Sequence, residues 1–175
     1  MKKALIVVDF QNDFINGSLG FEKAKRLEKV ILQKLTNFKD DIIFTFDTHD
    51  DKYLQSKEGK NLPIKHCLIN SPGWNMPENF TPFLKKAKKI FYKNTFGSLE
   101  LANFLQDENY DELEFCGLVS HICVFANIIL AHSASLNTKL ILDLNATASF
   151  DDDLHNKTLD ILRVFNVELI PLNQD

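Results

Sequence analysis

The sequence predicts an α/β protein with a doubly wound, Rossmann-like and mostly parallel six-stranded sheet and helices on both of its faces. Three observations support this fold class. Six short runs of β-forming residues recur along the chain and alternate with segments of helical periodicity. Strands that alternate with helices are typical of parallel sheets. The chain has 175 residues, of which 45% are hydrophobic, which is enough for one contiguous core.

The expected elements can be placed in order along the chain. Strands are expected at residues 4–8, 41–46, 89–92, 112–116, 139–142 and 167–170. Helices are expected at residues 22–35, 97–105, 121–134 and 152–165. The first helix is amphipathic, since its apolar residues share one face: Ala24, Leu27, Val30, Ile31 and Leu35. No internal repeat or second boundary interrupts this order, so residues 1–175 are interpreted as a single domain.

One connection, between the second and third expected strands, is unusually long. A connection of this length inside a compact domain is usually functional or disordered. It contains Trp74, several prolines and the histidines His49 and His66, a composition unlike that of a disordered linker. We therefore expect this segment to contribute to a functional site.

Composition argues against several classes of partner. The chain has 20 Lys and Arg against 24 Asp and Glu, interleaved with apolar residues, so no basic face is expected for nucleic acid. The apolar run at residues 4–8 is too short for a signal peptide and ends in an acid, and the one at 122–134 is too short to cross a bilayer. Three irregularly spaced cysteines do not form a disulfide framework. We expect a cytoplasmic protein with reduced thiols and no membrane partner.

Titratable side chains follow most of the expected strands. In open parallel sheets, ligands bind beyond the carboxyl ends of the strands. Taken singly, each side chain has an ordinary explanation as a cap, a surface charge or a small core residue. Together they predict a site at one edge of the sheet. The groups concerned are Asp9, Asp47, His49, Lys93, the loop 117–123 with its Cys123, and Asp143.

The three cysteines have different expected roles. Cys123 lies near the start of an expected helix, after a loop that contains Gly117. Free backbone N–H groups and the helix dipole at such a position favour a thiolate and can hold an oxyanion. Cys116 lies within a strand and is expected to be inert, whereas Cys67 follows His66 in the long connection and its role stays open.

These motifs resemble the isochorismatase-like superfamily of cysteine hydrolases, and within it most of all the nicotinamidases. The resemblance covers residues 3–170 and rests on a combination of motifs rather than on any one of them. The matching elements are Val7-Val8-Asp9-Phe10-Gln11-Asn12-Asp13-Phe14, the pair Asp47 and His49, His66, Lys93 with Phe96-Gly97-Ser98, and Gly117-Leu118-Val119 ahead of Cys123.

The resemblance implies a catalytic triad of Asp9, Lys93 and Cys123. It also implies a cis peptide between Leu118 and Val119, and an oxyanion hole formed by the backbone N–H groups of Val119 and Cys123. Asp9 would take the thiol proton and the sulfur would attack an amide, leaving a thioester that water hydrolyses. Lys93 would lower the thiol pKa by its charge.

The resemblance further implies a divalent metal. Its ligands would be Asp47, His49 and His66, with Glu58 as a fourth. Carboxylate and imidazole donors suit Zn, and also Mn or Fe. The competing explanation is that His49 and His66 are loop residues that make local hydrogen bonds.

The implied activity is hydrolysis of nicotinamide to nicotinate and ammonia, a step of NAD salvage. Phe14 and Trp74 are expected in the substrate pocket, and Thr48 stands where the nearest nicotinamidases often have Trp. A small-molecule amide is thus the expected partner, and the 15 phenylalanines allow a homo-oligomer.

Two other functions stay open at this stage. One is a metal-independent hydrolase of N-carbamoyl compounds or other small amides. The other is a non-catalytic small-molecule binding domain on the same fold, since fold does not determine function. The presence of Asp9, Lys93 and Cys123 together argues against the second, and an isochorismatase is disfavoured because its vinyl-ether chemistry does not require the cysteine.

Overall fold

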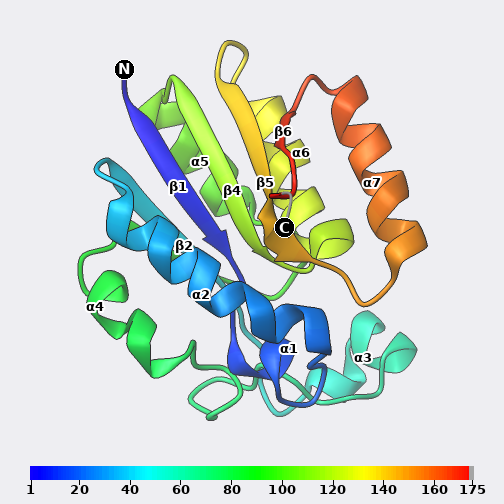
Figure 1. The fold of residues 1–175 in the computed structure, drawn as a ribbon. Coiled ribbons are helices and arrows are strands. Elements are labelled where there is room, and N and C mark those ends of the chain that lie inside the picture. The colour runs from blue at the N-terminus through cyan, green and yellow to red at the C-terminus, as the bar shows by residue number, and fades with distance from the viewer. Residues whose placement is uncertain (174–175) are drawn as a thin grey trace.

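A computed structural model describes residues 1–173 and has one six-stranded parallel sheet with the order β3-β2-β1-β4-β5-β6 (Figure 1). The doubly wound α/β prediction is confirmed, and every strand pair is parallel. The strands are β1 (Lys3–Val8), β2 (Asp41–Asp47), β3 (Lys89–Lys93), β4 (Glu112–Leu118), β5 (Lys139–Ala148) and β6 (Glu168–Ile170).

Helices cover both faces of the sheet because the central strand β1 is apolar on both sides. Its residues Leu5 and Val7 pack with α1 (Asn12–Ile15) and with α2 (Glu22–Asn37), and Figure 1 shows α2 in front of the sheet. Ala4, Ile6 and Val8 face the opposite layer. That layer is formed by α5 (Leu99–Glu108), α6 (Phe125–Ala134) and α7 (Asp152–Val164). Two apolar cores therefore hold β1, and with it the residue that follows it, in a fixed place.

Local capping explains where the rear helices begin. The Ser98 hydroxyl accepts a hydrogen bond from Leu101 N (3.1 Å), so α5 starts after the expected residue 97. Asp151 caps α7 in the same way through Leu154 N (2.9 Å). The helix expected from residue 121 begins instead as a π-helical turn, Ser120–Val124, that continues into α6.

Strand β5 is longer than the sequence predicts. Asp143 was expected at its end, but the strand passes through Asp143 and continues to Ala148, and the register with β4 shifts on the way. The polar residue is tolerated because Lys34 of α2 pairs with the Asp143 carboxylate (2.6 Å) and with Glu114. Asp143 is therefore part of a buried structural ion pair, and the expectation that it belongs to the ligand-binding edge is wrong.

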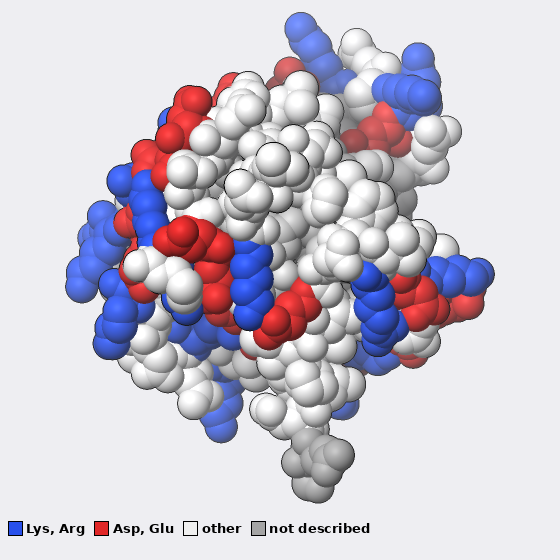
Figure 2. Space-filling model, turned by 90° about the horizontal axis from the view of Figure 1, so that it is seen from above, with Lys and Arg blue, Asp and Glu red and all other residues white. Residues whose placement is uncertain are grey.

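The long connection between β2 and β3 is folded over the carboxyl ends of the strands (Figure 1). It contains the short helices η1 (Tyr53–Gln55), α3 (Lys57–Asn61), η2 (Glu78–Phe80) and α4 (Thr81–Leu84). A single parallel bridge between His49 and Leu68 ties its two halves together. Within residues 1–173, the helices are all too short or too polar to span a bilayer. On the face seen from the top of Figure 1, basic and acidic side chains are intermixed (Figure 2).

Candidate active site

A cavity of about 1320 Å³ opens at the carboxyl ends of the strands. Its walls come from segments that are far apart in sequence: the region after β1, the long connection after β2, the loop after β3, the turn after β4 and Phe150 beyond the end of β5. The parallel topology accounts for this meeting, because parallel strands all end at the same edge.

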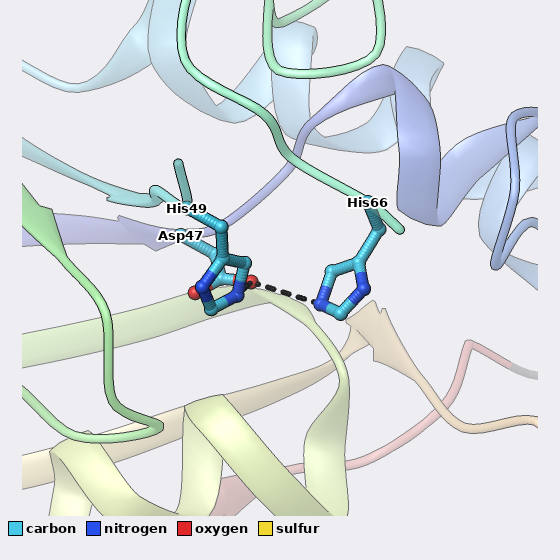
Figure 3. A group of neighbouring side chains, drawn as sticks. All are labelled: Asp47, His49 and His66. Carbon is cyan, nitrogen blue, oxygen red and sulfur yellow. Dashed lines mark hydrogen bonds and ion pairs between the residues drawn. The ribbon is translucent and has the colours of Figure 1, made fainter. Parts of the chain in front are cut away.

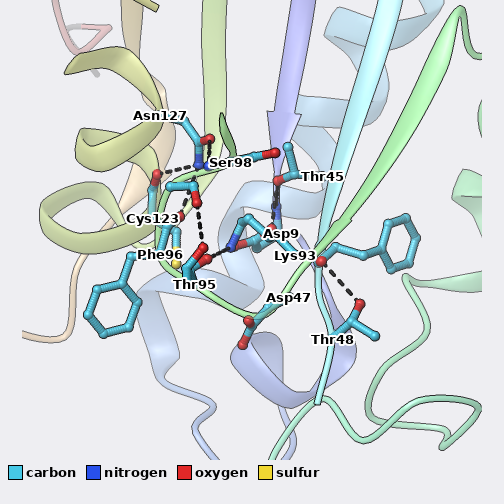
Figure 4. Close-up of polar contacts among 12 residues, drawn as sticks. Asp9, Thr45, Asp47, Thr48, Lys93, Thr95, Phe96, Ser98, Cys123 and Asn127 are labelled. Atoms are coloured by element: carbon cyan, nitrogen blue, oxygen red, sulfur yellow. Dashed lines mark hydrogen bonds and ion pairs between the residues drawn. The ribbon is translucent and has the colours of Figure 1, made fainter. Parts of the chain in front are cut away.

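Asp9 and Lys93 form a buried ion pair beneath this cavity (Figure 4). Asp9 follows β1 with a φ of 45°, and its carboxylate oxygen Oδ2 lies 2.5 Å from Lys93 Nζ. The second oxygen, Oδ1, accepts a hydrogen bond from the Thr45 hydroxyl (2.6 Å), and Lys93 Nζ donates to the Thr95 carbonyl (3.1 Å). Apart from Lys93, Oδ2 has no hydrogen-bond partner among residues 1–173. This oxygen is the free acceptor of the site.

Burial and charge have opposite effects on the pKa values of the pair. Burial raises the pKa of Asp9 above its ordinary value, although the Lys93 charge opposes the shift. Burial works against a charged Lys93, but the neighbouring Asp9 carboxylate raises the pKa of Lys93. Lys93 is thus a permanent cation, and Asp9 is a stronger base than an exposed carboxylate.

Cys123 lies in the π-helical turn after β4 and faces the same cavity. Its side chain is buried, and this burial raises the thiol pKa well above its ordinary value even though Lys93 acts in the opposite direction. Lys93 lowers the thiol pKa, as expected, but burial has the larger and opposite effect. A base must therefore remove the thiol proton when Cys123 reacts.

The backbone around Cys123 is unusual in two respects. The peptide bond between Leu118 and Val119 is cis, where the sequence led us to expect it. Gly117 has a φ of 109°, and a Cβ atom at this position would lie 2.1 Å from the Val8 carbonyl oxygen. Only glycine allows β4 to approach β1 this closely and still turn toward the cavity.

Asn127 joins the turn of Cys123 to the loop after β3 (Figure 4). Its Nδ2 donates to the carbonyl of Cys123 (2.8 Å) and to that of Phe96 (3.1 Å), and its Oδ1 accepts from Ser98 N (3.0 Å). The side chain is buried. Sequence reasoning missed both Asn127 and Thr45, because their partners lie on other elements.

Asp47, His49 and His66 form a second buried group in the cavity wall (Figure 3). Asp47 Oδ2 lies 3.1 Å from His49 Nε2 and 3.4 Å from His66 Nε2. Glu58 Oε1 lies 4.0 Å and 3.7 Å from the same two nitrogens. Ligand atoms around a tetrahedral zinc are roughly 3.3–3.6 Å apart. The donors Asp47, His49 and His66 and their spacing fit one divalent cation, and Glu58 lies at the edge of this group.

Hydrogen bonds orient these donors. The His66 Nδ1 lies 2.8 Å from the Ile64 carbonyl, which directs Nε2 toward Asp47. Burial opposes a charged Asp47, but hydrogen bonds with His49 and His66 hold the pKa of this carboxyl well below its ordinary value. Asp47 is therefore an anion, as a metal ligand must be.

The segment after β1 holds the two ligand-bearing loops in place. Gln11 bonds both backbone groups of Asp47, donating to its carbonyl (2.8 Å) and accepting from its N–H (2.8 Å). Asp13 accepts from the N–H of Cys67 (2.7 Å), next to His66. The Gln11-Asn12-Asp13 motif thus supports the candidate metal site rather than the substrate.

The expected pocket residues have different positions. Phe14 lines the cavity beside His66, with ring centroids 5.7 Å apart. Trp74 is not among the described residues that line it, which corrects the sequence prediction. Trp74 stacks on Tyr92 (centroids 5.6 Å apart) and its indole N–H donates to the Thr48 hydroxyl (2.9 Å). Thr48 holds Trp74 outside the cavity, so Tyr53 is the aromatic ring nearest the histidines, 4.6 Å from His49.

The remaining cysteines are buried away from water. Burial raises the pKa of Cys67 and of Cys116 far above the ordinary thiol value, and neither lines the cavity. Cys123 is the one described cysteine with access to a ligand.

Comparisons with known proteins identify the family and the fold of the chain. The family model described as "Isochorismatase domain" matches residues 3–174. A nicotinamidase/pyrazinamidase of Mycobacterium tuberculosis is 27% identical over 188 residues, covering 96% of this chain and 98% of that protein. The crystal structure of a Bacillus subtilis nicotinamidase has a TM-score of 0.81 and 28% identity, covering 98% of this chain and 100% of its own. A Streptococcus mutans pyrazinamidase/nicotinamidase has a TM-score of 0.84 and 26% identity, covering 97% and 100%.

Proposed function

This chain belongs to the isochorismatase family and is a hydrolase of an amide C–N bond, and from that premise we propose that it is a metal-dependent nicotinamidase. Its reaction would convert nicotinamide to nicotinate and ammonia through a thioester. One observation carries the proposal: the Cys123 thiol lines the same cavity as the metal-ligand candidates Asp47, His49 and His66, and the buried Asp9–Lys93 pair lies beneath it.

Asp9 would act as the base of the acylation step. Among the described residues, its oxygen Oδ2 contacts Lys93 and accepts no other hydrogen bond. It can therefore take the proton of the Cys123 thiol as the sulfur attacks the amide carbon. The raised pKa of Asp9 suits a group that accepts a proton and then returns it to the departing ammonia. Lys93 stays charged throughout and stabilises the negative charge that passes from the carboxylate to the sulfur.

Backbone N–H groups of Val119 and Cys123 would hold the oxyanion that forms on the amide oxygen. Val119 follows the cis peptide, and both residues line the cavity. Removing one such donor typically costs about 10²- to 10³-fold in kcat. Water, activated by Asp9 as the base, would then hydrolyse the thioester and regenerate the thiol.

Asp47, His49, His66 and Glu58 would hold the metal. Bound there, a zinc, manganese or iron ion supplies a Lewis acid that can coordinate a ring nitrogen of the substrate. The anionic Asp47 is the form that such a site requires. Fixing the orientation of the substrate in this way can lower the reaction barrier by several kcal/mol.

The proposal is tested by ammonia release from nicotinamide and from benzamide, which lacks the ring nitrogen. Nicotinamide should be turned over far faster, and a chelator should remove most of this preference. Elemental analysis should find stoichiometric metal in wild type, and much less in His49→Ala and His66→Ala. His132→Ala is the matched control, because His132 is exposed on α6 away from the cavity.

Two outcomes would contradict the proposal. Metal retained at full stoichiometry in both ligand variants would remove these histidines from the site. Full activity in metal-free wild type would favour the metal-independent hydrolase of N-carbamoyl compounds or other small amides.

A further inference from the structure

The cavity is larger than a one-ring amide requires. Its volume of about 1320 Å³ exceeds the roughly 300–1,000 Å³ typical of pockets that bury drug-sized ligands. One end carries the polar groups Asp47, His49, Glu58 and His66. A nicotinamide placed between these groups and Cys123 would leave the other end of the cavity unfilled.

That other end is apolar, and we call it the apolar compartment: Phe21, Phe96, Val119, Ile122 and Phe150. These side chains come from the segments after β1, β3, β4 and β5, so the topology of the sheet gathers them. Figure 4 shows Phe96 on the same side of the Asp9–Lys93 pair as Cys123, with Thr48 on the opposite side. The nucleophile therefore borders the apolar compartment.

Two rings of this compartment are exposed to an unusual degree. Phe96 is 48% exposed and Phe150 is 62% exposed, although large aromatic side chains gain most from burial. An exposed apolar surface that borders a catalytic group often marks a binding site. Part of each ring therefore stays open to an apolar ligand group at the cavity mouth.

Contacts within the protein fix the ring of Phe150 and the backbone of Phe96 without a ligand. Phe150 packs edge-on against Phe21 (centroids 6.1 Å apart) and against His121 (5.1 Å), and Ser149 Oγ lies 2.8 Å from His121 Nδ1. The carbonyl of Phe96 accepts from Asn127 Nδ2 (3.1 Å). Because this wall is already ordered, little conformational entropy is lost when a ligand binds to it.

We propose that the apolar compartment is a second subsite, which binds a hydrophobic substituent carried by the amide substrate. The preferred substrates are then heteroaromatic amides with an apolar group on the ring, rather than nicotinamide itself. The inference rests on the proposed function for the position of the amide. Each methylene that the compartment buries should raise kcat/KM by roughly 4-fold.

The experiment measures kcat/KM for nicotinamides with hydrogen, methyl, ethyl, propyl or butyl at ring carbon 5, which adjoins neither the nitrogen nor the carboxamide. In wild type kcat/KM should rise with chain length, to at least tenfold for butyl over hydrogen. In Phe96→Ala and Phe150→Ala this ratio should fall several-fold. Leu136→Ala, which removes an exposed leucine outside the cavity, should keep the wild-type ratio.

A flat or falling series in wild type, with nicotinamide hydrolysed, would overturn the subsite and leave the proposed function intact. If no member of the series is hydrolysed, the proposed function is wrong, and the subsite is then tested by measuring binding. Calorimetric affinity for 5-butylnicotinate should then still exceed that for nicotinate and decrease in Phe96→Ala. Equal affinities would overturn the subsite independently of catalysis.

Discussion

The two ends of the sheet carry the same kind of ion pair in opposite environments. At the amino end, Lys139 and Glu168 lie 2.7 Å apart with side chains 49% and 54% exposed. At the carboxyl end, Lys93 and Asp9 lie 2.5 Å apart with side chains 3% and 0% exposed. Water screens the first pair, whereas the second acts in a medium of low dielectric constant. Burial, not the contact itself, decides which pair perturbs the chemistry around it.

The amino end also shows a regular pattern of charge. The first residue of each strand alternates in sign across the sheet from β3 to β6. In spatial order these residues are Lys89, Asp41, Lys3, Glu112, Lys139 and Glu168. Opposite charges on neighbouring strands are mildly favourable and like charges unfavourable. The amino end therefore supports the strand order weakly, through several exposed or half-buried groups, while the carboxyl end concentrates a few buried ones.

The largest effects are expected from the groups that react. Cys123→Ala removes the nucleophile and should abolish measurable turnover, while Asp9→Asn removes the base and should lower kcat by about 10³-fold or more. The double variant should be little worse than Cys123→Ala alone, since the two groups act as one unit. Steady-state ammonia release measures all three.

Alkylation separates the cysteines independently of turnover. Iodoacetamide should label Cys123 before Cys116, because only the former lines the cavity. Mass spectrometry of partly labelled protein identifies the site. Preferential labelling of Cys116, or near wild-type kcat in Asp9→Asn, would contradict the assigned roles.

The next effect tests the comparison between the two ends directly. Lys93→Met leaves Asp9 buried beside no cation, and breaking a buried pair typically costs about 3–5 kcal/mol of stability. Lys3→Met is the matched control, since Lys3 pairs with Glu112 (2.8 Å) at the amino end with a side chain 32% exposed. It should cost about 1 kcal/mol or less. Urea unfolding of both variants measures the two costs.

The loss of folding stability caused by Lys93→Met should depend on pH. The folded-state pKa of Asp9 is raised, and removing Lys93 removes the influence that lowers it. A carboxyl with a raised folded-state pKa holds its proton more tightly when folded, so stability decreases as pH rises above its ordinary value of 3.8. The deficit of Lys93→Met relative to wild type should therefore be smaller at pH 5 than at pH 8. Equal deficits at both pH values would show that Asp9 is not the group left uncompensated.

A smaller effect is expected at Asn127, which touches no reacting atom. Asn127→Ala removes both donors that join the Cys123 turn to the Phe96 loop, and buried groups left unpaired cost about 1–3 kcal/mol each. Stability and kcat should both decrease, and alkylation of Cys123 should change in rate because its turn is no longer fixed. Ser133→Ala, which removes an exposed hydroxyl from the same helix, should change none of the three.

Outcomes at Asn127 distinguish a positioning role from a merely structural one. If stability falls while kcat and the alkylation rate are unchanged, Asn127 only holds the helices together. Recovery of kcat in Asn127→Gln without recovery of stability would support positioning, since the amide donors are then restored on a longer side chain.

The sequence predicted the sheet because its signal is local. The apolar residues of β1 and the amphipathic pattern of α2 are visible without any partner, and both were placed within two residues of their observed bounds. Asp143 was misplaced because its neutralising partner, Lys34, lies on a different element. Similarly, Trp74 was expected in the pocket, but a hydrogen bond with Thr48 and stacking on Tyr92 hold it outside.

The candidate site likewise combines residues that the sequence indicated with properties that it could not indicate. Motifs indicated Asp9, Lys93 and Cys123; in the structure Asp9 and Lys93 form a buried ion pair, and Cys123 lines the cavity. The direction of the Cys123 pKa could not be predicted, because it depends on burial rather than on the helix start that the sequence reveals. Positioning groups such as Thr45 have no motif of their own, since their role exists only once β1 and β2 are paired.

The smallest effect is expected where the comparison began, at Lys139 and Glu168. Both side chains are about half exposed, so their attraction is screened by water and offset by the side-chain entropy lost on pairing. A double-mutant cycle with Lys139→Met and Glu168→Gln should give a coupling free energy of about 0–1 kcal/mol, which decreases at 1 M salt. Neither variant should change kcat, because neither residue lines the cavity. The alternating charges could nevertheless act together across the edge, and in that case the coupling would exceed that of an isolated exposed pair. A value above about 2 kcal/mol that persists in 1 M salt would show that the amino end is as cooperative as the carboxyl end, and the contrast between the two ends would fail.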